Sequence, residues 1–342
     1  MKINHIKKGT SGILAVHQKF LYSEFKKSNW GAGAKPAESR MLSLTHITCS
    51  DNASVGRKIM FDKIILNLRT QCPLVHNITN YVTVNDVANA ELAIGASPVM
   101  TDEIDDVKDM AAIASAININ IGTLNKRTIE SMFLAGEIAN KNGTVVVLDP
   151  VGAGATKLRT DTCVELMNKV HFDVIKGNMS EIKVLATSFG VTEATSQESN
   201  TTKGVDVNEN DAISDKNLSA NIALVKAFAK KVNSIIAVTG KFDLITDGEK
   251  CYVIANGHEL MEKVCGTGCM ISGLMAAFVA ANKDNKLEAA AACVASMGIA
   301  GDRGVASLKP TQGNSTLKES IIDNLMLIDD AALQAEAKVE VK

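Results

Sequence analysis

The segment Cys265-Gly266-Thr267-Gly268-Cys269 directly precedes apolar residues that recur with the period of one helical face. Glycines at such a point let the backbone approach a ligand closely, because no Cβ stands in the way. The start of a helix leaves N–H groups unpaired and carries about half a positive charge, which suits a phosphate or a phosphoryl group in transfer. The same positive end favours the thiolate form of Cys269, that is, a pKa below the ~8.5 of a free cysteine. Taken alone, the pentapeptide is equally compatible with an ordinary glycine-rich helix start that holds a buried cysteine.

Three further polar residues, Asp149, Lys176 and Thr239, each come directly after a short β-branched run and stand near a glycine. The runs cover residues 144–148, 174–175 and 234–238. Ligands of doubly wound α/β sheets gather outside the carboxyl ends of the strands, so these side chains are expected at one edge of a sheet. Singly, each has an ordinary alternative: a helix cap, a solvated surface lysine and a simple turn.

Asn178 and Glu181 stand three apart at a predicted helix start, so they share one helical face. The carboxylates of Glu181 and Asp149 could hold a magnesium ion, directly or through waters, because Mg²⁺ takes oxygen ligands and keeps several waters. Lys176 would then supply a positive charge for a β- or γ-phosphate. The spacing of Asn178 and Glu181 serves helix capping equally well, and that alternative stays open.

The elements that must position these residues follow a regular pattern from about Phe61 onward. Helical patterns are predicted around residues 64–68, 82–94, 105–116, from 270 onward and over 287–305, and a hairpin over 244–246 and 252–254. Short strands separated by helical stretches are typical of a mostly parallel sheet. The polar stretch over residues 192–202 lacks a period and is predicted to be a surface loop.

Composition excludes several classes of protein. The formal net charge of the 342 residues is −2, no basic stripe is present and aromatic residues are 4%, which argues against a nucleic-acid surface. No apolar run is long enough to cross a membrane and the N-terminus lacks a signal-type core. Seven cysteines without a CxxC pair or a histidine at metal-binding spacing argue against disulfides and zinc. A cytoplasmic enzyme fits these limits.

From about residue 63 to residue 306, the sequence resembles the hydroxyethylthiazole kinases, a thiamine-salvage family of the ribokinase-like superfamily. The segments that carry the resemblance are, in chain order, residues 73–80, 95–100, 148–154, 176–178 with Glu181, 238–240 and 266–269. The motifs around Asp149 and Glu181 indicate only the superfamily. The first segment, the turn that ends in Met100, and Cys269 point to this member of it.

The resemblance implies a ribokinase-like three-layer sandwich with helices on both faces of a mostly parallel sheet. It also implies transfer of the ATP γ-phosphoryl group to the hydroxyl of 4-methyl-5-(2-hydroxyethyl)thiazole. A homotrimer is implied as well, with sites between neighbouring subunits, so that Met100 and the segment around Asn80 face the nucleotide-binding half of an adjacent chain.

Residue roles follow from the resemblance position by position. Thiazole contacts fall on Asn80, Met100 and Gly266, with Asn77 a weaker neighbour; ATP contacts fall on Lys176 and Thr239; magnesium association falls on Asp149 and Glu181. Gly266, Gly268 and Cys269 fall at the site of phosphoryl transfer. Cys269 stands where most of the superfamily has an aspartate that acts as a base, and whether it removes a proton stays open, because a loose transition state demands little base.

This sequence departs from the family pattern in three places. Lys176 is often an arginine in relatives, so the charge is kept and the bidentate fork is lost. Cys265 stands where threonine or serine is common, with little expected effect. Residues 1–59 have no counterpart, and the kinase domain is expected to span residues 60–342. The extension is predicted to be disordered, and codons for residues 30–32, 37–39 and 51–56 can spell riboswitch-like strings, so a translated leader is one hypothesis.

Two other functions remain as alternatives. A ribokinase-like kinase for another small alcohol such as hydroxymethylpyrimidine, or a related dehydratase, would be favoured by an aspartate at position 269. A non-catalytic nucleotide sensor with the same fold would be favoured by loss of Asp149, Glu181 or Lys176, and all three are present.

Overall fold

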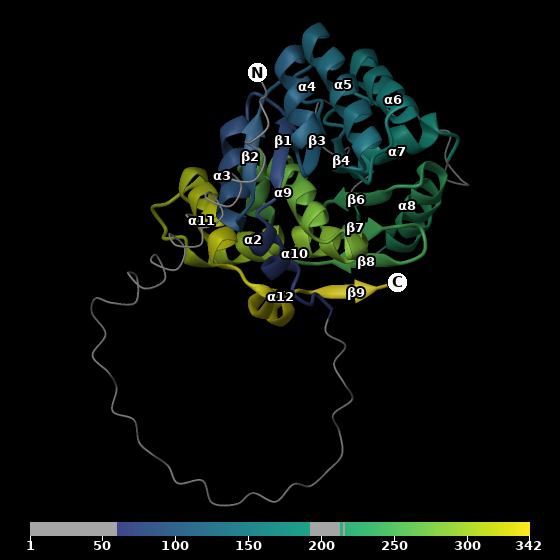
Figure 1. The fold of residues 1–342 in the computed structure, drawn as a ribbon. Coiled ribbons are helices and arrows are strands. Elements are labelled where there is room, and N and C mark those ends of the chain that lie inside the picture. Colours follow the sequence, from purple (N-terminus) through teal and green to yellow (C-terminus); the bar gives the residue numbers. More distant parts are fainter. Residues whose placement is uncertain (1–59, 192–212, 215) are drawn as a thin grey trace, which may run out of the picture. The chain divides into compact units, whose positions relative to one another are not determined.

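The computed structural model describes residues 60–191, 213–214 and 216–342, and residues 61–342 form one compact unit. The predictions for residues 1–59 and for the loop over 192–202 lie outside these described residues. Within them, nine strands form one sheet (Figure 1): β1 (Leu74–Ile78), β2 (Ser97–Met100), β3 (Ala116–Asn120), β4 (Val145–Asp149), β5 (Val174–Asn178), β6 (Ile235–Thr239), β7 (Asp243–Thr246), β8 (Cys251–Ile254) and β9 (Val339–Val341).

The helices that connect and cover these strands are mostly short. They are α2 (Ile64–Gln71), α3 (Val84–Ile94), α4 (Ile104–Ile113), α5 (Lys126–Asn142), α6 (Lys157–Lys169), α7 (Met179–Ser188), α8 (Leu218–Val232), α9 (Thr267–Ala281), α10 (Lys286–Ser307), α11 (Asn314–Leu327) and α12 (Asp330–Glu336), with 3₁₀ turns η2 (Glu259–Lys263) and η3 (Lys283–Asn285). None of the helices in the described part of the chain has the length and apolar character needed to cross a membrane.

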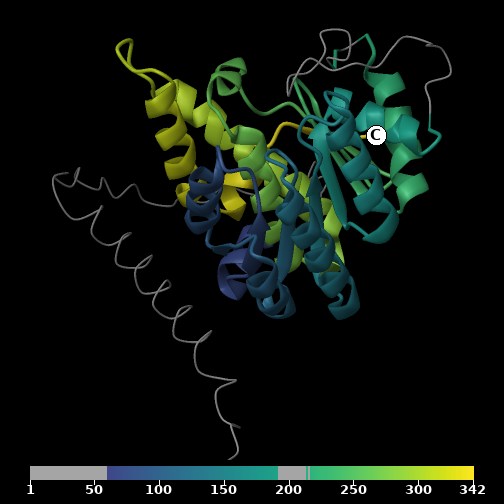
Figure 2. The same ribbon diagram turned by 90° about the horizontal axis from the view of Figure 1, so that it is seen from above.

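The strand order is β2-β1-β3-β4-β5-β6-β7-β8-β9. The strands from β2 to β6 are parallel, and β7, β8 and β9 add antiparallel pairs at one side. Helices α4 to α8 cover one face, while α2, α3, α9, α10 and α11 lie on the other (Figures 1 and 2). The predicted three-layer sandwich with a mostly parallel sheet is therefore confirmed.

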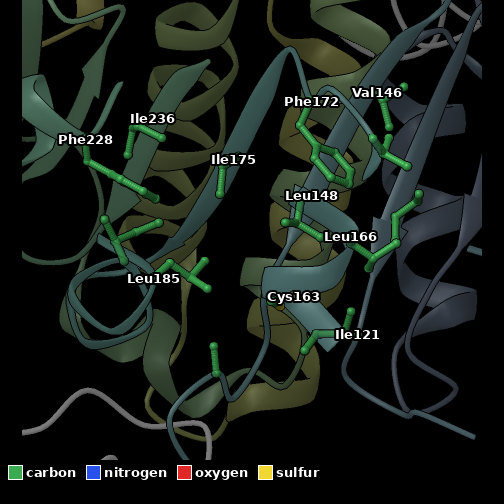
Figure 3. Packing of buried hydrophobic residues seen from close by; sticks show 14 of the residues in the cluster. Ile121, Val146, Leu148, Cys163, Leu166, Phe172, Ile175, Leu185, Phe228 and Ile236 are labelled. Atoms are coloured by element: carbon green, nitrogen blue, oxygen red, sulfur yellow. The ribbon is translucent and has the colours of Figure 1, made fainter. Parts of the chain in front are cut away.

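The core between the sheet and helices α5 to α8 is built from alternate strand residues. Figure 3 shows Leu148 and Ile175 of neighbouring strands beside Leu166 and Leu185 of the covering helices. Each fully buried side chain of this size stabilises the fold by roughly 1.5–3 kcal/mol. Because side chains alternate along a strand, the residues next to these, among them Asp149 and Lys176, point to the opposite face.

Helix α9 fills the centre of that opposite face. Every residue from Cys269 to Ala281 is buried, because α2, α3, α10 and the sheet surround the helix. A helix that is apolar on all sides must be enclosed in this way. Its N-terminus is thereby fixed against the carboxyl ends of the parallel strands.

The predicted strands over 144–148, 174–175 and 234–238 correspond to β4, β5 and β6, and the predicted hairpin corresponds to β7 and β8. The helix predicted over 105–116 is wrong at its end, because α4 stops at Ile113 and Ala116 begins a fully buried strand. The segment ending in Met100 is an edge strand rather than a turn, and its Pro98 is tolerated because an edge strand needs fewer N–H donors.

Candidate active site

The carboxyl ends of β3, β4 and β5 meet the start of α9. Four residues predicted from sequence come together there, namely Asp149, Lys176, Gly268 and Cys269. Lys176 is 4% exposed, and its Nζ donates to the carbonyl oxygen of Gly268 at 3.0 Å. The same Nζ lies 3.4 Å from Oδ2 of Asp149. Burial alone would lower the pKa of Lys176, but the negative charge of Asp149 and further acidic neighbours outweigh this and raise it. The lysine therefore stays positively charged, and the alternative of a solvated surface residue is excluded.

Asp149 is fully buried at the end of β4, and its two oxygens differ in their surroundings. Oδ2 accepts from Asn120 Nδ2 at 3.0 Å, from the hydroxyl of Ser272 and from Lys176. Oδ1 is buried and has no hydrogen-bond partner among the described residues. A buried carboxylate oxygen without a partner is costly, and a bound cation or water would relieve that cost.

Glu181 lies in the first turn of α7 with both carboxylate oxygens engaged. Oε2 accepts from the N–H of Asn178 at 2.8 Å, and the Asn178 side chain accepts from the N–H of Glu181 at 2.9 Å. This is the capping box that the spacing allowed. Oε1 accepts from the N–H of Gly152 at 2.7 Å, in the loop that follows Asp149. Burial, with the nearby charge of Asp149, raises the pKa of Glu181 to about 7.

Cys269 is 8% exposed in the first turn of α9, with its sulfur 3.3 Å from Asn120 Nδ2. Burial raises the pKa of the thiol and the charge of Asp149 raises it further, against smaller opposing effects of Lys176 and two side-chain hydrogen bonds. The expectation that the helix start favours the thiolate is therefore wrong. Removal of water from the sulfur is the largest cause of the raised pKa.

Gly266 and Gly268 stand at this helix start for different structural reasons. Gly266 has φ +90°, and a Cβ there would lie 2.6 Å from Thr83 Cγ2. Both the backbone conformation and the close approach therefore require glycine. A Cβ on Gly268 would lie 3.1 Å from Lys176 Nζ, in the space next to the buried cation.

The residues predicted to contact the alcohol substrate are only partly gathered here. Asn80 follows β1, and its amide lies where a Cβ on Gly122 would reach it. Thr83 links this segment to Gly266: its hydroxyl donates to the carbonyl oxygen of Asn80 at 3.4 Å, and its methyl group lies against Gly266. Met100 ends edge strand β2 and is in register with Asn77 of β1, three residues before Asn80.

Asn77 itself is turned into the protein. It is 1% exposed, its Nδ2 lies 3.2 Å from Glu91 Oε2, and its Oδ1 accepts from Asn118 at 2.8 Å. A side chain with these partners supports β1 against α3 and β3. The implied role of Asn77 as a weaker substrate neighbour stays a prediction.

A cavity of about 690 Å³ opens beside the helix start. Thr239, Asn178, Thr267 and Gly268 line the end next to the buried cation. Ile271, Val294 and Met297 line its apolar part. The cavity is thus lined by both polar groups and apolar side chains, as ligand sites commonly are.

Sequence reasoning missed Asn120, Ser272 and Thr83. Asn120 ends a strand whose sequence alternates asparagine with isoleucine, and that alternation could have identified both the strand and the polar side chain that closes it. Ser272 stands three residues after Cys269, which places it on the same helical face. Nothing in the sequence near Thr83 indicates its contact with Gly266, since the two residues are distant in the chain.

The sequence model of the hydroxyethylthiazole kinase family matches residues 65–330. Hydroxyethylthiazole kinase of Clostridium acetobutylicum is 47% identical over 281 residues, which cover 82% of this chain and 99% of that protein. The solved hydroxyethylthiazole kinase of Pyrococcus horikoshii is 35% identical, with a TM-score of 0.72 over 83% of this chain and 99% of its own. A ribokinase-like superfamily protein of Enterococcus faecalis, 13% identical with a TM-score of 0.50 over 79% of this chain and 94% of its own, shares the fold. Together with the arrangement of Asp149, Lys176 and the Gly266–Cys269 helix start, these matches show that the chain belongs to the hydroxyethylthiazole kinase family.

Proposed function

We propose that this protein transfers the γ-phosphoryl group of ATP to the primary hydroxyl of 4-methyl-5-(2-hydroxyethyl)thiazole, in thiamine salvage. The observation that carries the proposal is the junction of Lys176, Asp149 and Gly268, a buried cation and a buried carboxylate at a glycine-rich helix start. Phosphoryl transfer depends on positioning and charge neutralisation more than on covalent help. This junction supplies both.

ATP would occupy the cavity of about 690 Å³. Its adenine would lie against Ile271, Val294 and Met297, and its phosphates would extend past Thr239 to the start of α9. The N–H groups of residues 266–269 would stabilise the equatorial oxygens of the transferring group, because unpaired donors at a helix start cost no reorganisation during the reaction. Lys176 would offset the charge on the phosphates.

The residues around Asp149 fit a magnesium ion. Among the described residues, no cluster of three or more His, Cys, Asp or Glu side chains could hold a metal alone. Mg²⁺ commonly uses one or two carboxylates together with waters and substrate phosphates, and the unpartnered Oδ1 of Asp149 is a ligand of that kind. Glu181 would act beside it, directly or through a water. When bound, the ion would neutralise charge on the β- and γ-phosphates.

Gly266, Asn80 and Met100 would bind the thiazole, and Cys269 would lie beside the substrate hydroxyl. Because the pKa of the thiol is raised, Cys269 would act as a neutral hydrogen-bonding group rather than as a preformed base. Transfer through a loose transition state is compatible with that role.

Release of ADP in the presence of magnesium ions tests the proposal. The thiazole alcohol should give rapid release, and hydroxymethylpyrimidine at the same concentration should give release near the rate of the blank. A preference for hydroxymethylpyrimidine would show that the protein is a kinase with a different substrate. Lack of release with any small alcohol would contradict the kinase itself.

We also propose a homotrimer whose sites lie between subunits. Tyr81 and Val82 directly follow Asn80 and are 53% and 70% exposed, so apolar surface is available beside the proposed thiazole contacts. Met100 lies on an edge strand, where a neighbouring chain could bring a nucleotide-binding half to it. Sedimentation of a fully active monomer would contradict the shared site.

Residues 60–342 are proposed to be the complete catalytic unit, with residues 1–59 taking no part in catalysis. A chain that begins at Met60 should then match the full chain in kcat and KM. The DNA that encodes residues 30–56 tests the leader hypothesis, which fails if its bases cannot form the riboswitch stems. A cytoplasmic location is proposed, supported by six free cysteines in the described residues.

A further inference from the structure

Asn120 ends strand β3 between the two halves of the site and is 1% exposed. Its Nδ2 donates to Oδ2 of Asp149 at 3.0 Å and to the sulfur of Cys269 at 3.3 Å. An amide nitrogen carries two hydrogens, so both donations can be made at the same time. The side chain therefore bridges the carboxylate on the phosphate side and the thiol on the alcohol side.

The orientation of this amide follows from its other partner. Oδ1 of Asn120 accepts from the N–H of Gly122 at 2.8 Å. The N–H of Gly122 needs an acceptor, and the carboxylate of Asp149 needs a donor. Only one of the two amide orientations of Asn120 provides an oxygen for Gly122 and an NH₂ group for Asp149. The NH₂ group must face Asp149 and Cys269.

We propose that Asn120 is a positioning residue of the phosphoryl transfer, which fixes the Cys269 thiol relative to the Asp149 carboxylate through one planar amide. The inference rests on the proposed function, because it places the alcohol beside Cys269 and the phosphates beside Asp149. Reactive geometry requires the attacking and accepting atoms to lie about 3–3.5 Å apart. A rigid link between the groups that hold the two reactants therefore serves the rate of transfer rather than the binding of either one.

The arrangement also directs the hydrogen of the thiol. Because Asn120 donates to the sulfur, the S–H of Cys269 is left to point away from the amide. The side chain of Thr83 also hydrogen-bonds with the thiol, so two neutral side chains limit its orientation. In this arrangement a neutral thiol can contact the substrate hydroxyl in a defined way.

A purely structural role would consist of holding the loop after β3 through Gly122. The variant Asn120→Asp separates the two roles, since it keeps the Oδ1 acceptor for Gly122 and loses both donations. Its shape is unchanged, so no cavity is created. Its second oxygen places a carboxylate beside Asp149 Oδ2, and this repulsion acts with and without the Cys269 thiol, so it cancels in a cycle that compares the two backgrounds. Ser272 provides a matched control, because its hydroxyl hydrogen-bonds with the same Asp149 oxygen and its other partner is the carbonyl oxygen of Gly268 rather than the Cys269 sulfur.

The test is a pair of double-variant cycles on kcat at saturating ATP and thiazole alcohol. Asn120→Asp should lower kcat about tenfold more in the Cys269 protein than in the Cys269→Ala protein. The KM for ATP of Asn120→Ser, which adds no charge beside Asp149, should change by less than about threefold. Ser272→Ala and Cys269→Ala should combine multiplicatively, within about twofold.

Multiplicative losses for Asn120 and Cys269 would overturn the proposal, and so would an equal coupling for Ser272. Urea unfolding of the same variants shows whether each one folds and whether the contact itself couples the two side chains without substrate. If Asn120→Asp does not fold, Asn120→Ser replaces it in both cycles. If the wild type phosphorylates no alcohol, the proposed function fails. Independently of activity, additive losses of unfolding free energy for the Asn120 and Cys269 variants would show that Asn120 does not join the Cys269 thiol to the Asp149 carboxylate.

Discussion

Lys176 donates from its buried Nζ to the carbonyl oxygen of Gly268, 3.0 Å away, so the cation of strand β5 is tied to the first turn of α9. A Cβ on Gly268 would lie 3.1 Å from that nitrogen. Gly268→Ala requires only a small shift of a flexible lysine end and should keep kcat within about tenfold of the wild type. Gly268→Val fills the space of the phosphate and should lower kcat about 100-fold or more. ADP release measures both, and near-normal release by the valine variant would refute the role of this helix start.

The ion pair between Lys176 and Asp149 is buried, with side chains 6% and 1% exposed. Lys176→Met leaves a buried carboxylate without its cation, so we expect a loss of about 3–5 kcal/mol in unfolding free energy. Lys176→Met with Asp149→Asn removes both charges and should recover most of that loss. Both variants should be inactive. Equal unfolding free energies for the single and the double variant would contradict the pairing.

Gly266 combines a left-handed backbone with close contact to Thr83. Gly266→Ala should cost about 1–3 kcal/mol and lower activity, because the Cβ would lie 2.6 Å from Thr83 Cγ2. Thr83→Ser removes that methyl group and should restore part of the stability. Gly143→Ala is the control, because Gly143 has φ +65° with nothing within 4 Å of its Cβ position. It should show the backbone cost alone, about 1 kcal/mol, and an equal loss at both glycines would exclude the contact with Thr83.

Asp243 lies in the wall of the cavity that we propose for ATP, and burial raises its pKa to about 7. An unfolded aspartate titrates near pH ~3.9, so between about pH 4 and pH 7 the folded state holds a proton that the unfolded state has lost. Unfolding free energy therefore falls as pH rises through this window. Asp243→Asn keeps an acceptor for the N–H of Gly240, and its stability relative to the wild type should increase by a few kcal/mol, on the order of 1–4, between about pH 4 and pH 8. Urea unfolding at several pH values measures this; an advantage that does not change with pH would contradict the shift.

Helix α10 offers two glycines for comparison beside the cavity that we propose for ATP: Gly298 lines the cavity, and Gly301 contacts Met261, which also lines it. A Cβ on Gly298 would meet the backbone of Asn256 at 2.8 Å, whereas one on Gly301 would meet the flexible end of Met261. Gly298→Ala should displace the wall of the cavity and raise the KM for ATP about tenfold, with the KM for the thiazole alcohol unchanged. Gly301→Ala should raise it less than about threefold, since the methionine can move. The reverse order would show that the adenine does not lie against this part of the helix.

Much of the fold and part of the site could be predicted from sequence. Strands β4, β5 and β6 are short β-branched runs that end in polar residues, and those residues lie at the expected edge. Strand β3 was missed because Ala116 continues the apolar spacing of the preceding helix. The segment forms a strand because tertiary packing buries all of its residues, which local spacing does not show.

The charges of the site could not be predicted in the same way. Lys176 could have been a surface lysine, and only the distance to Asp149 shows a buried pair. The pKa of Cys269 was predicted in the wrong direction, because the sequence shows the helix start and conceals the loss of water around the sulfur. Asn120 and Thr83 reach the site from elements distant in the chain, so neither role follows from local spacing.

Helix α2 depends on residues far along the chain. The carboxylate of Asp330 accepts from the N–H groups of Ile65 and Leu66 at 2.8 and 3.0 Å, and 265 residues separate Asp330 from Ile65. A ribosome that adds about 5–20 residues per second needs roughly 13–50 s to synthesise the chain between Ile65 and Asp330. During synthesis the parallel strands emerge well before the cap of α2 and before the antiparallel strand β9 that completes the sheet. Nascent chains of this protein therefore pass through a long interval with open strand edges, and chaperone engagement at the ribosome should be strongest in that interval.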